Sequence, residues 1–157
     1  MNSRRRGNVS ISIVTVVFAC GPGPSAYDPA EPWTTGKITL ASEIPVANAS
    51  FLHVRLFETP KYPAEELGTP LWLHSNAVTV TQNSFPAAYE TPGGIGCVDT
   101  VHLRTVAWIS KDQASEMPHD REPFGVTDFV AETCGTQDRI CACGNTAVDV
   151  HIDRSSF

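Results

Sequence analysis

The segment TVHLRTVAWIS, residues 100–110, alternates between two sets of side chains along its whole length. Side chains of a β-strand point in turn to the two faces of a sheet, so this period of two predicts a strand. One face carries Val101, Leu103, Thr105, Ala107 and Ile109, and the other carries His102, Arg104, Val106 and Trp108. It is the longest strand that the sequence predicts, and a chain built on such segments is constrained to fold as sheets.

Six further segments have the composition and patterning of short strands, and turn-rich loops separate them. They are GKITLAS (36–42), FLHVRLFE (51–58), LWLHS (71–75), NAVTVTQ (76–82), FGVTDFVAE (124–132) and NTAVDVHID (145–153). No convincing amphipathic helix accompanies them. Seven short strands without helices predict an all-β fold, namely a single seven-stranded antiparallel β-sandwich over residues 36–157.

The expected inward faces and the expected loops follow from the same pattern. Inward positions include Leu52, Val54 and Leu56 in one strand, and Val148, Val150 and Ile152 in the last strand. Long loops are expected at 59–70, 85–99 and 110–123. Long loops on a β-scaffold are typical places for binding.

The first nineteen residues predict an export signal. Arg4, Arg5 and Arg6 precede an uncharged segment over residues 9–19. As a helix that segment would span only about 16 Å at ~1.5 Å per residue, whereas a bilayer core is ~30 Å thick. A basic start followed by a short apolar stretch is typical of a secretory signal peptide, here residues 1–19. A buried N-terminal strand is the alternative.

The sequence Val17-Phe18-Ala19-Cys20 ends this segment and resembles the lipobox of bacterial lipoproteins. In that family the chain is cut before the cysteine, which then carries acyl chains. The resemblance implies lipidation at Cys20 and, with Gly21 following, attachment to the outer membrane. Stable anchoring takes two or more membrane-binding signals, which a multiply acylated cysteine provides. Cleavage of an ordinary secretory signal is the competing interpretation.

Residues 20–35 contain Pro22, Pro24, Pro29 and Pro32, which prevent helix and sheet pairing and predict a semi-extended tether. Removal of residues 1–19 takes away three arginines and no acidic residue, which leaves 8 basic and 17 acidic residues and a formal charge of −9. An acidic chain argues against nucleic acid as a partner and against docking on anionic lipid through protein charge. We expect the membrane contact to be made by lipid.

The five cysteines fit the same interpretation. If lipid occupies Cys20, four remain: Cys97, Cys134, Cys141 and Cys143. In an oxidising compartment these four predict two disulfides, with three possible pairings. Cys141 and Cys143 are separated by one residue, so we favour each of them pairing with Cys97 or Cys134. A zinc site is the alternative, but only one closely spaced pair is present.

Two long segments, GKITLASEIPVANASFLHVRLFE (36–58) and LRTVAWISKDQASEMPHDREPFG (103–125), are similar to small exported bacterial sandwiches of the transthyretin-like or carboxypeptidase-regulatory type. The resemblance covers residues 36–153 and depends on strand pattern. It implies a prealbumin-like or immunoglobulin-like sandwich. It implies no activity, since such folds serve as spacers, adhesion modules and binding domains.

Candidate sites for chemistry are weak. Asp112, Glu116, Asp120 and Glu122 supply oxygen ligands in the 110–123 loop, without a recognised calcium spacing. His53 and His102 lie mid-strand and would bind zinc or copper only if their strands brought them together. No hydrolase motif or triad is present, so no catalytic residue, metal or cofactor is predicted.

The sequence therefore predicts a non-catalytic, membrane-anchored lipoprotein that is a structural or binding module of the bacterial cell envelope. An envelope protein or a carbohydrate is the expected partner. A metal-binding or enzyme-accessory envelope protein is the alternative.

Overall fold

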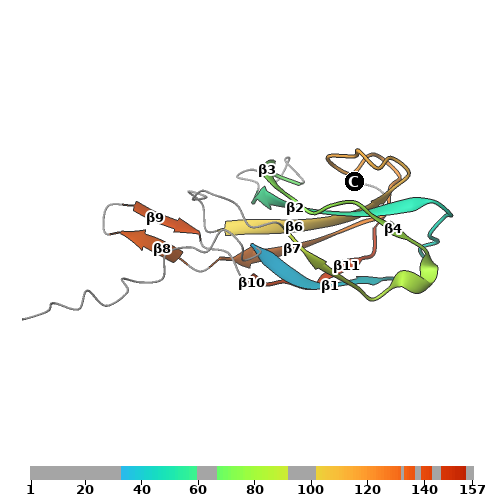
Figure 1. The fold of residues 1–157 in the computed structure, drawn as a ribbon, viewed down its shortest axis with the longest axis horizontal. Coiled ribbons are helices and arrows are strands. Elements are labelled where there is room, and N and C mark those ends of the chain that lie inside the picture. Colours follow the sequence, from blue (N-terminus) through green and yellow to red (C-terminus); the bar gives the residue numbers. More distant parts are fainter. Residues whose placement is uncertain are drawn as a thin grey trace, which may run out of the picture.

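A computed structural model describes residues 33–59, 67–91, 102–131, 133–136, 139–142 and 146–154. The described chain is all-β, with two sheets that face each other (Figure 1). The prediction of an all-β protein is confirmed. The predicted signal peptide 1–19, Cys20, Cys97 and Cys143 lie outside the described residues.

The first sheet, called sheet I, is built around the N-terminal strand. It contains β1 (Thr34–Leu40), β5 (Ala87–Glu90), β10 (Thr146–Ala147) and β11 (Val150–Ile152). The strand β5 is antiparallel to β1, whereas β10 and β11 are parallel to it. Because Thr34 pairs with Thr146 and Ile38 with Val150, β10 and β11 keep one offset and form a single interrupted line beside β1.

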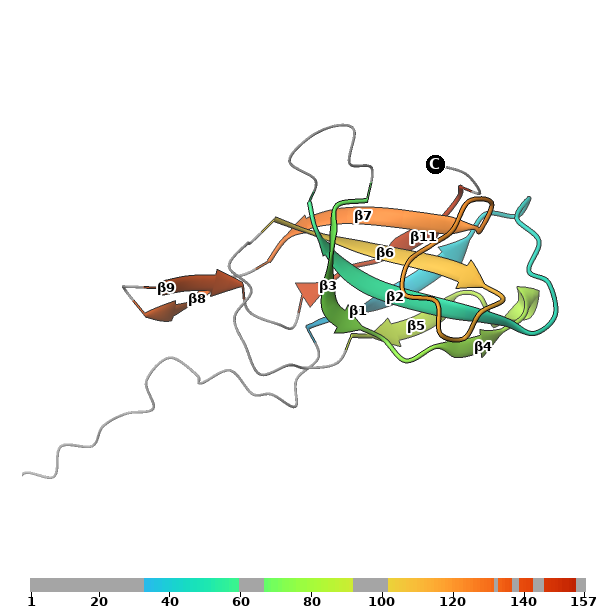
Figure 2. The ribbon, with the colours of Figure 1, turned by 90° about the horizontal axis from the view of Figure 1, so that it is seen from above.

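The second sheet, called sheet II, is antiparallel and larger. It contains β3 (Thr69–His74), β4 (Val78–Val80), β2 (Ser50–Glu58), β6 (His102–Ser110) and β7 (Phe124–Val130). Both β3 and β4 pair with the edge of β2 that β6 leaves free. The hairpin of β8 (Thr133–Thr136) and β9 (Arg139–Ala142) lies beyond the end of both sheets (Figure 2).

The described residues form eleven strands, where the sequence predicts seven. Every predicted segment overlaps a strand, and 145–153 contains two, β10 and β11. The strand β5 lies inside the expected loop 85–99. The sequence pattern also does not predict the β8–β9 hairpin. The expectation of a wholly antiparallel sandwich is wrong at β1, because the C-terminal strand returns beside it in the same direction. The strand β1 begins at Thr34, before the predicted boundary at residue 36.

The core between the sheets contains the predicted inward side chains. It includes Ile38, Leu52, Val54, Leu56, Ala107, Ile109, Val150 and Ile152, all at most 4% exposed. Trp33 is also buried, against Leu56, Leu73 and Leu103. The alternation in 51–58, 100–110 and 145–153 therefore identifies the inner faces correctly.

The outer face of sheet II is covered as well. Phe57, Leu67, Val106, Trp108 and Phe124 form a second buried cluster there. The loop 111–123 passes over this face and covers part of it (Figure 1). Sequence alternation alone assigns Phe57, Val106 and Trp108 to the less apolar face, whereas the returning loop makes that face a second core.

The two long edges of the sandwich differ. At one edge β7 lies against β11: Phe124 and Arg154 exchange main-chain hydrogen bonds of 2.8 and 3.2 Å, and Thr127 donates to the Asp149 carbonyl. At the other edge β4 and β5 are not hydrogen-bonded to each other within the described residues. One edge is therefore closed by main-chain contact and the other is open. Within the described residues there is no helix long and apolar enough to cross a membrane.

Candidate functional site

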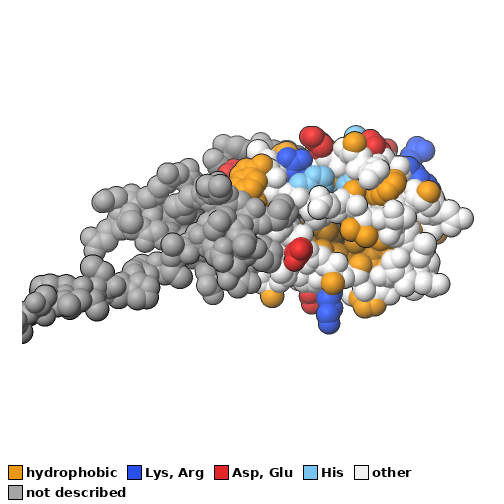
Figure 3. Space-filling view, viewed as in Figure 1, with side chains coloured by type: hydrophobic (Ala, Val, Ile, Leu, Met, Phe, Trp, Pro, Cys, Tyr) orange, Lys and Arg blue, Asp and Glu red, His pale blue; other side chains and the backbone are white. Residues whose placement is uncertain are grey.

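A cleft of about 580 Å³ lies at the open edge, between β4 and β5. Figure 3 views the molecule from this side and shows apolar side chains in the hollow between the two sheets. The cleft is lined by Leu52, Val54, Ser75, Asn76, Val78, Thr79, Val80, Ser84, Ala87, Ala88, Tyr89 and Glu90. Its volume lies within the ~300–1,000 Å³ range that is usual for ligand sites.

The lining divides into an apolar floor and a polar rim. Leu52 and Val54 are inward-facing side chains of β2 and are buried, at 4% and 1% exposure. Ser75 and Asn76, in the break between β3 and β4, contribute polar groups. The cleft can therefore hold an apolar molecule or side chain while hydrogen-bonding groups remain at its mouth.

Tyr89 forms the end of the cleft on the β5 side. Its side chain is buried, and its hydroxyl donates to the carbonyl of Val148 at 2.7 Å. Burial raises the pKa of Tyr89, so the hydroxyl is protonated at neutral pH. The ring is therefore held in place by the segment between β10 and β11, and the wall that it provides is preformed.

A second cluster, called the His–Trp cluster, lies on the outer face of sheet II. The ring centroids of His53 and Trp108 are 5.0 Å apart, those of His74 and Trp108 5.6 Å, and those of the two histidines 5.7 Å. His53 is fully buried and bonds through Nε2 to the Asp112 carbonyl at 3.0 Å. His53 Nδ1 and His74 Nε2 are buried and have no hydrogen-bond partner among the described residues.

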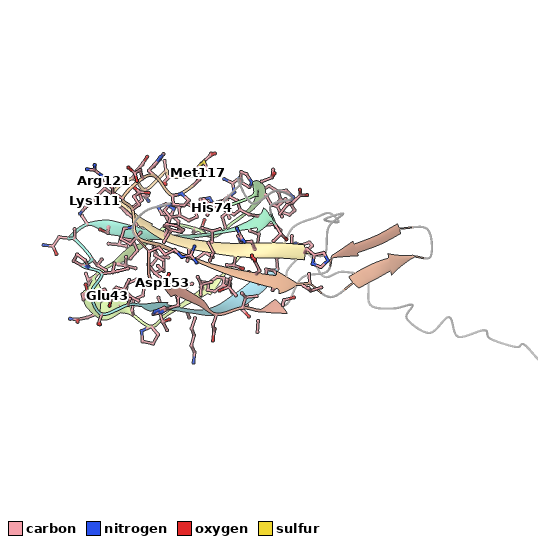
Figure 4. All side chains as sticks on the ribbon, turned by 180° about the vertical axis from the view of Figure 1, so that it is seen from behind. Glu43, His74, Lys111, Met117, Arg121 and Asp153 are labelled. Carbon is pink, nitrogen blue, oxygen red and sulfur yellow. The ribbon has the colours of Figure 1, made fainter. Side chains whose placement is uncertain are left out.

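The loop 111–123 is held onto this cluster by specific bonds. Trp108 Nε1 donates to Ser115 Oγ at 3.0 Å, and Ser115 donates to the Met117 carbonyl at 2.9 Å. Arg55 Nη1 donates to the Glu116 carbonyl at 2.9 Å. Figure 4 shows His74 and Met117, which belongs to the loop, on the same side of sheet II.

Two of the four acidic residues that the sequence offers as cation ligands, Asp112 and Glu122, have structural roles in this loop, whereas the side chains of Glu116 and Asp120 are exposed. Glu122 accepts from Ser110 Oγ at 2.6 Å and from the His119 amide at 2.9 Å. Asp112 accepts from the Ala114 amide at 2.8 Å. Within the described ranges no group of three or more His, Cys, Asp or Glu side chains converges on a possible metal position.

The sequence suggests that His53 could lie beside His102, but the structure places His53 beside His74. His53 pairs with Trp108 across β2 and β6, whereas His102 begins β6 at the far end of the same pair. At about 3.4 Å per residue, six positions separate them by roughly 20 Å. His74 is the histidine beside His53, because the register sets Arg55 opposite His74. No spacing signal in the sequence indicates this neighbour.

The cysteines are only partly described. The register of the β8–β9 hairpin places Cys134 opposite Cys141. Directly opposed residues of antiparallel strands have Cα atoms about 4.5–5.5 Å apart, which is within the range that a disulfide spans. This is one of the pairings that the sequence leaves open, and the two disulfides stay a prediction.

Burial makes the His–Trp cluster sensitive to acid. Desolvation lowers the pKa of His53 and of His74, and the charges that face them are Glu122 and Asp112 for His53 and Arg55 and Glu116 for His74. Below the unfolded value of 6.5 the unfolded chain binds protons before the folded chain does. The free energy of unfolding is therefore greatest above this pH and falls as the pH is lowered through the folded pKa values.

We expect urea unfolding between neutral and acidic pH to show this loss of stability. The variant His74→Gln should have a shallower dependence on pH, because one of the two buried titrating rings is gone. An unchanged slope in that variant would contradict the assignment to His74.

Comparisons with protein-family models, with curated proteins and with solved structures return no match to this chain. Function is therefore assigned from the chain's own residues and geometry.

Proposed function

We propose that this protein is a non-catalytic binding module of the bacterial cell envelope, held at the membrane by acyl chains on Cys20. The anchor is supported by Val17-Phe18-Ala19-Cys20, which follows an uncharged segment with a basic start. The Gly21 that follows favours the outer membrane. The binding role is supported by one structural observation, the cleft between β4 and β5 with its apolar floor.

The proposal includes a prealbumin-like or immunoglobulin-like sandwich of the transthyretin-like type. If β3 with β4, and β10 with β11, are each counted as one interrupted strand, sheet II has four strand positions and sheet I has three. That total of seven supports this class. Such sandwiches serve as binding modules, for which an envelope protein or a carbohydrate is the expected partner.

Metabolic labelling with a fatty-acid probe tests the anchor. Whole cells that express the full chain should incorporate the probe into the protein, and the variant Cys20→Ala should not. The intact mass should correspond to removal of residues 1–19 and addition of acyl chains. With two disulfides among the other cysteines, it should also be about 4 Da below the reduced form.

The variant Cys97→Ala is the matched control, because it removes a cysteine that is predicted to form a disulfide. It should retain the label. A wild-type protein without label, or one labelled equally after Cys20→Ala, would show that lipid on this residue is not the anchor.

A further inference from the structure

Within the part of the chain that the structure describes, the strand β5 is hydrogen-bonded along only one of its edges. It pairs with β1 from Thr35↔Glu90 to Ile38↔Ala87, and the Thr91 amide donates to the Thr34 carbonyl at 2.9 Å. Bonded and non-bonded pairs alternate in an antiparallel ladder. The main-chain groups of Ala87 and Tyr89 therefore point to β1, and those of Ala88 and Glu90 point to the opposite edge.

That opposite edge borders the cleft. The side chains of Ala88 and Glu90 are exposed, on the face of sheet I that points away from the core, yet both residues line the cleft. The main-chain atoms of Ala88 and Glu90, and not their side chains, therefore border the cleft. Among the described residues, none makes a hydrogen bond to the main chain of Ala88 or Glu90. Unpaired N–H and C=O groups on a strand edge are a template for a further strand.

The facing wall and the floor suit the side chains of such a strand. Val78, Thr79 and Val80 line the cleft as consecutive residues, so the edge of β4 borders it too. Val78 is 58% exposed although it is apolar. A strand beside β5 would direct alternate side chains inward over Leu52 and Val54. A small apolar ligand would cover this floor but would leave the main-chain groups of β5 unbonded.

The charge of the cleft and of the whole chain limits which partners can bind in the cleft. Glu90 is the one charged residue among the described residues that line the cleft, and the whole chain carries a formal charge of −6. We propose that the cleft accepts an extended segment of another protein as an added strand beside β5, with alternate apolar side chains and neutral or basic flanks. This inference rests on the proposed binding role of the cleft and adds the class of partner.

A peptide titration followed by amide exchange tests the added strand. The probe is a short synthetic peptide of alternating threonine and valine with a lysine at each end, added to the purified full chain. Its binding should slow exchange of the Ala88 and Glu90 amides by about tenfold or more, because each gains a hydrogen bond. The Tyr89 amide, which is already bonded to β1, should change less.

Altered peptides test the backbone and charge requirements. A peptide with proline at its centre should bind at least about tenfold more weakly, since it cannot continue the ladder. A peptide with glutamate at each end should also bind more weakly than the lysine peptide. Equal binding of all three peptides would overturn the proposal.

The variant Ala88→Pro tests the edge itself. It removes the amide that faces the cleft but none of the bonds to β1, and proline is tolerated on an edge strand. Peptide affinity should fall by about tenfold, whereas the matched variant Ala88→Thr, which keeps the amide, should bind as the wild type does. Retained affinity in Ala88→Pro would place the peptide elsewhere.

The remaining outcomes separate this inference from the proposed function. Binding of octanol in the cleft, with no binding of any peptide, would overturn the added strand and leave the binding role intact. Protection of the Ala88 and Glu90 amides in a concentration-dependent dimer, without peptide, would assign the cleft to a second copy of this chain. Either result leaves the labelling of Cys20 unaffected.

Discussion

The variant Gly125→Ala is expected to destabilise the sandwich by about 3 kcal/mol or more, the upper end of the range for overpacking. A Cβ atom at this position would lie 2.0 Å from the His151 carbonyl oxygen and 3.0 Å from the Ile152 Cα. Both contacts are to main chain, which cannot rotate away as a side chain can. Residue 125 lies at the closed edge, where β7 and β11 touch directly.

The neighbouring bonds prevent relief of that contact. Phe124, next to Gly125, exchanges both main-chain hydrogen bonds with Arg154. Separation of β7 from β11 would break these bonds and open the core over Ile152, which is fully buried. The closed edge therefore either unfolds or rearranges when a methyl group is added.

Chemical unfolding in urea measures this effect, with Val130→Ala as the control in the same strand. Val130 is 62% exposed, so its truncation should change the free energy of unfolding by less than about 0.5 kcal/mol. Gly36→Ala should behave like Gly125→Ala, because its Cβ would lie 2.0 Å from the Val148 carbonyl oxygen. A loss below about 1 kcal/mol at residue 125 would show that the two strands are not in main-chain contact.

The alternation of side chains carries most of what the sequence reveals about the fold. It identifies the inner faces of β2, β6 and β11, because most residues between two sheets are apolar whichever strand lies beside them. It misses β5, whose sequence is Ala-Ala-Tyr-Glu. Alanine and glutamate are poor strand formers, so this strand depends on pairing with β1, which lies about fifty residues earlier in the chain.

The sequence does not predict the cleft or the His–Trp cluster, and the reason is related. The cleft exists because, within the described residues, β4 and β5 are not hydrogen-bonded to each other. An unpaired strand edge leaves no pattern in the sequence of the residues that border it. The His–Trp cluster joins residues from β2, β3 and β6 under a loop without periodicity. Both sites depend on contacts between distant segments, whereas alternation reports only the environment along one strand.

The second large effect is expected at the centre of the His–Trp cluster. The variant Trp108→Ala should lower the free energy of unfolding by about 3–5 kcal/mol, the usual cost of removing a buried aromatic side chain. Trp108 is fully buried, contacts His53 and His74 through its ring, and bonds to Ser115 through Nε1. Its removal leaves a cavity under the loop and also leaves the Ser115 hydroxyl without its donor.

Trypsin distinguishes loss of the loop contact from general unfolding. Lys111 and Arg121 lie in the loop and Lys37 lies in β1, so cleavage at the first two reports detachment of the loop. In native conditions Trp108→Ala should be cut faster at Lys111 and Arg121 than the wild type is, with a smaller change at Lys37. If Lys37 becomes accessible to the same degree, the ring stabilises the whole sandwich and not the loop.

Two further variants separate the contributions of the Trp108 ring. Trp108→Phe keeps an aromatic ring against the histidines but removes the bond to Ser115, so it should cost about 1 kcal/mol for the bond and somewhat more for the lost volume. Trp72→Ala is the matched control, because Trp72 lies in the same sheet but is 52% exposed. Its truncation should cost less than about 1 kcal/mol, since little of its surface is buried. A comparable loss at both tryptophans would mean that the loop does not cover this face of sheet II.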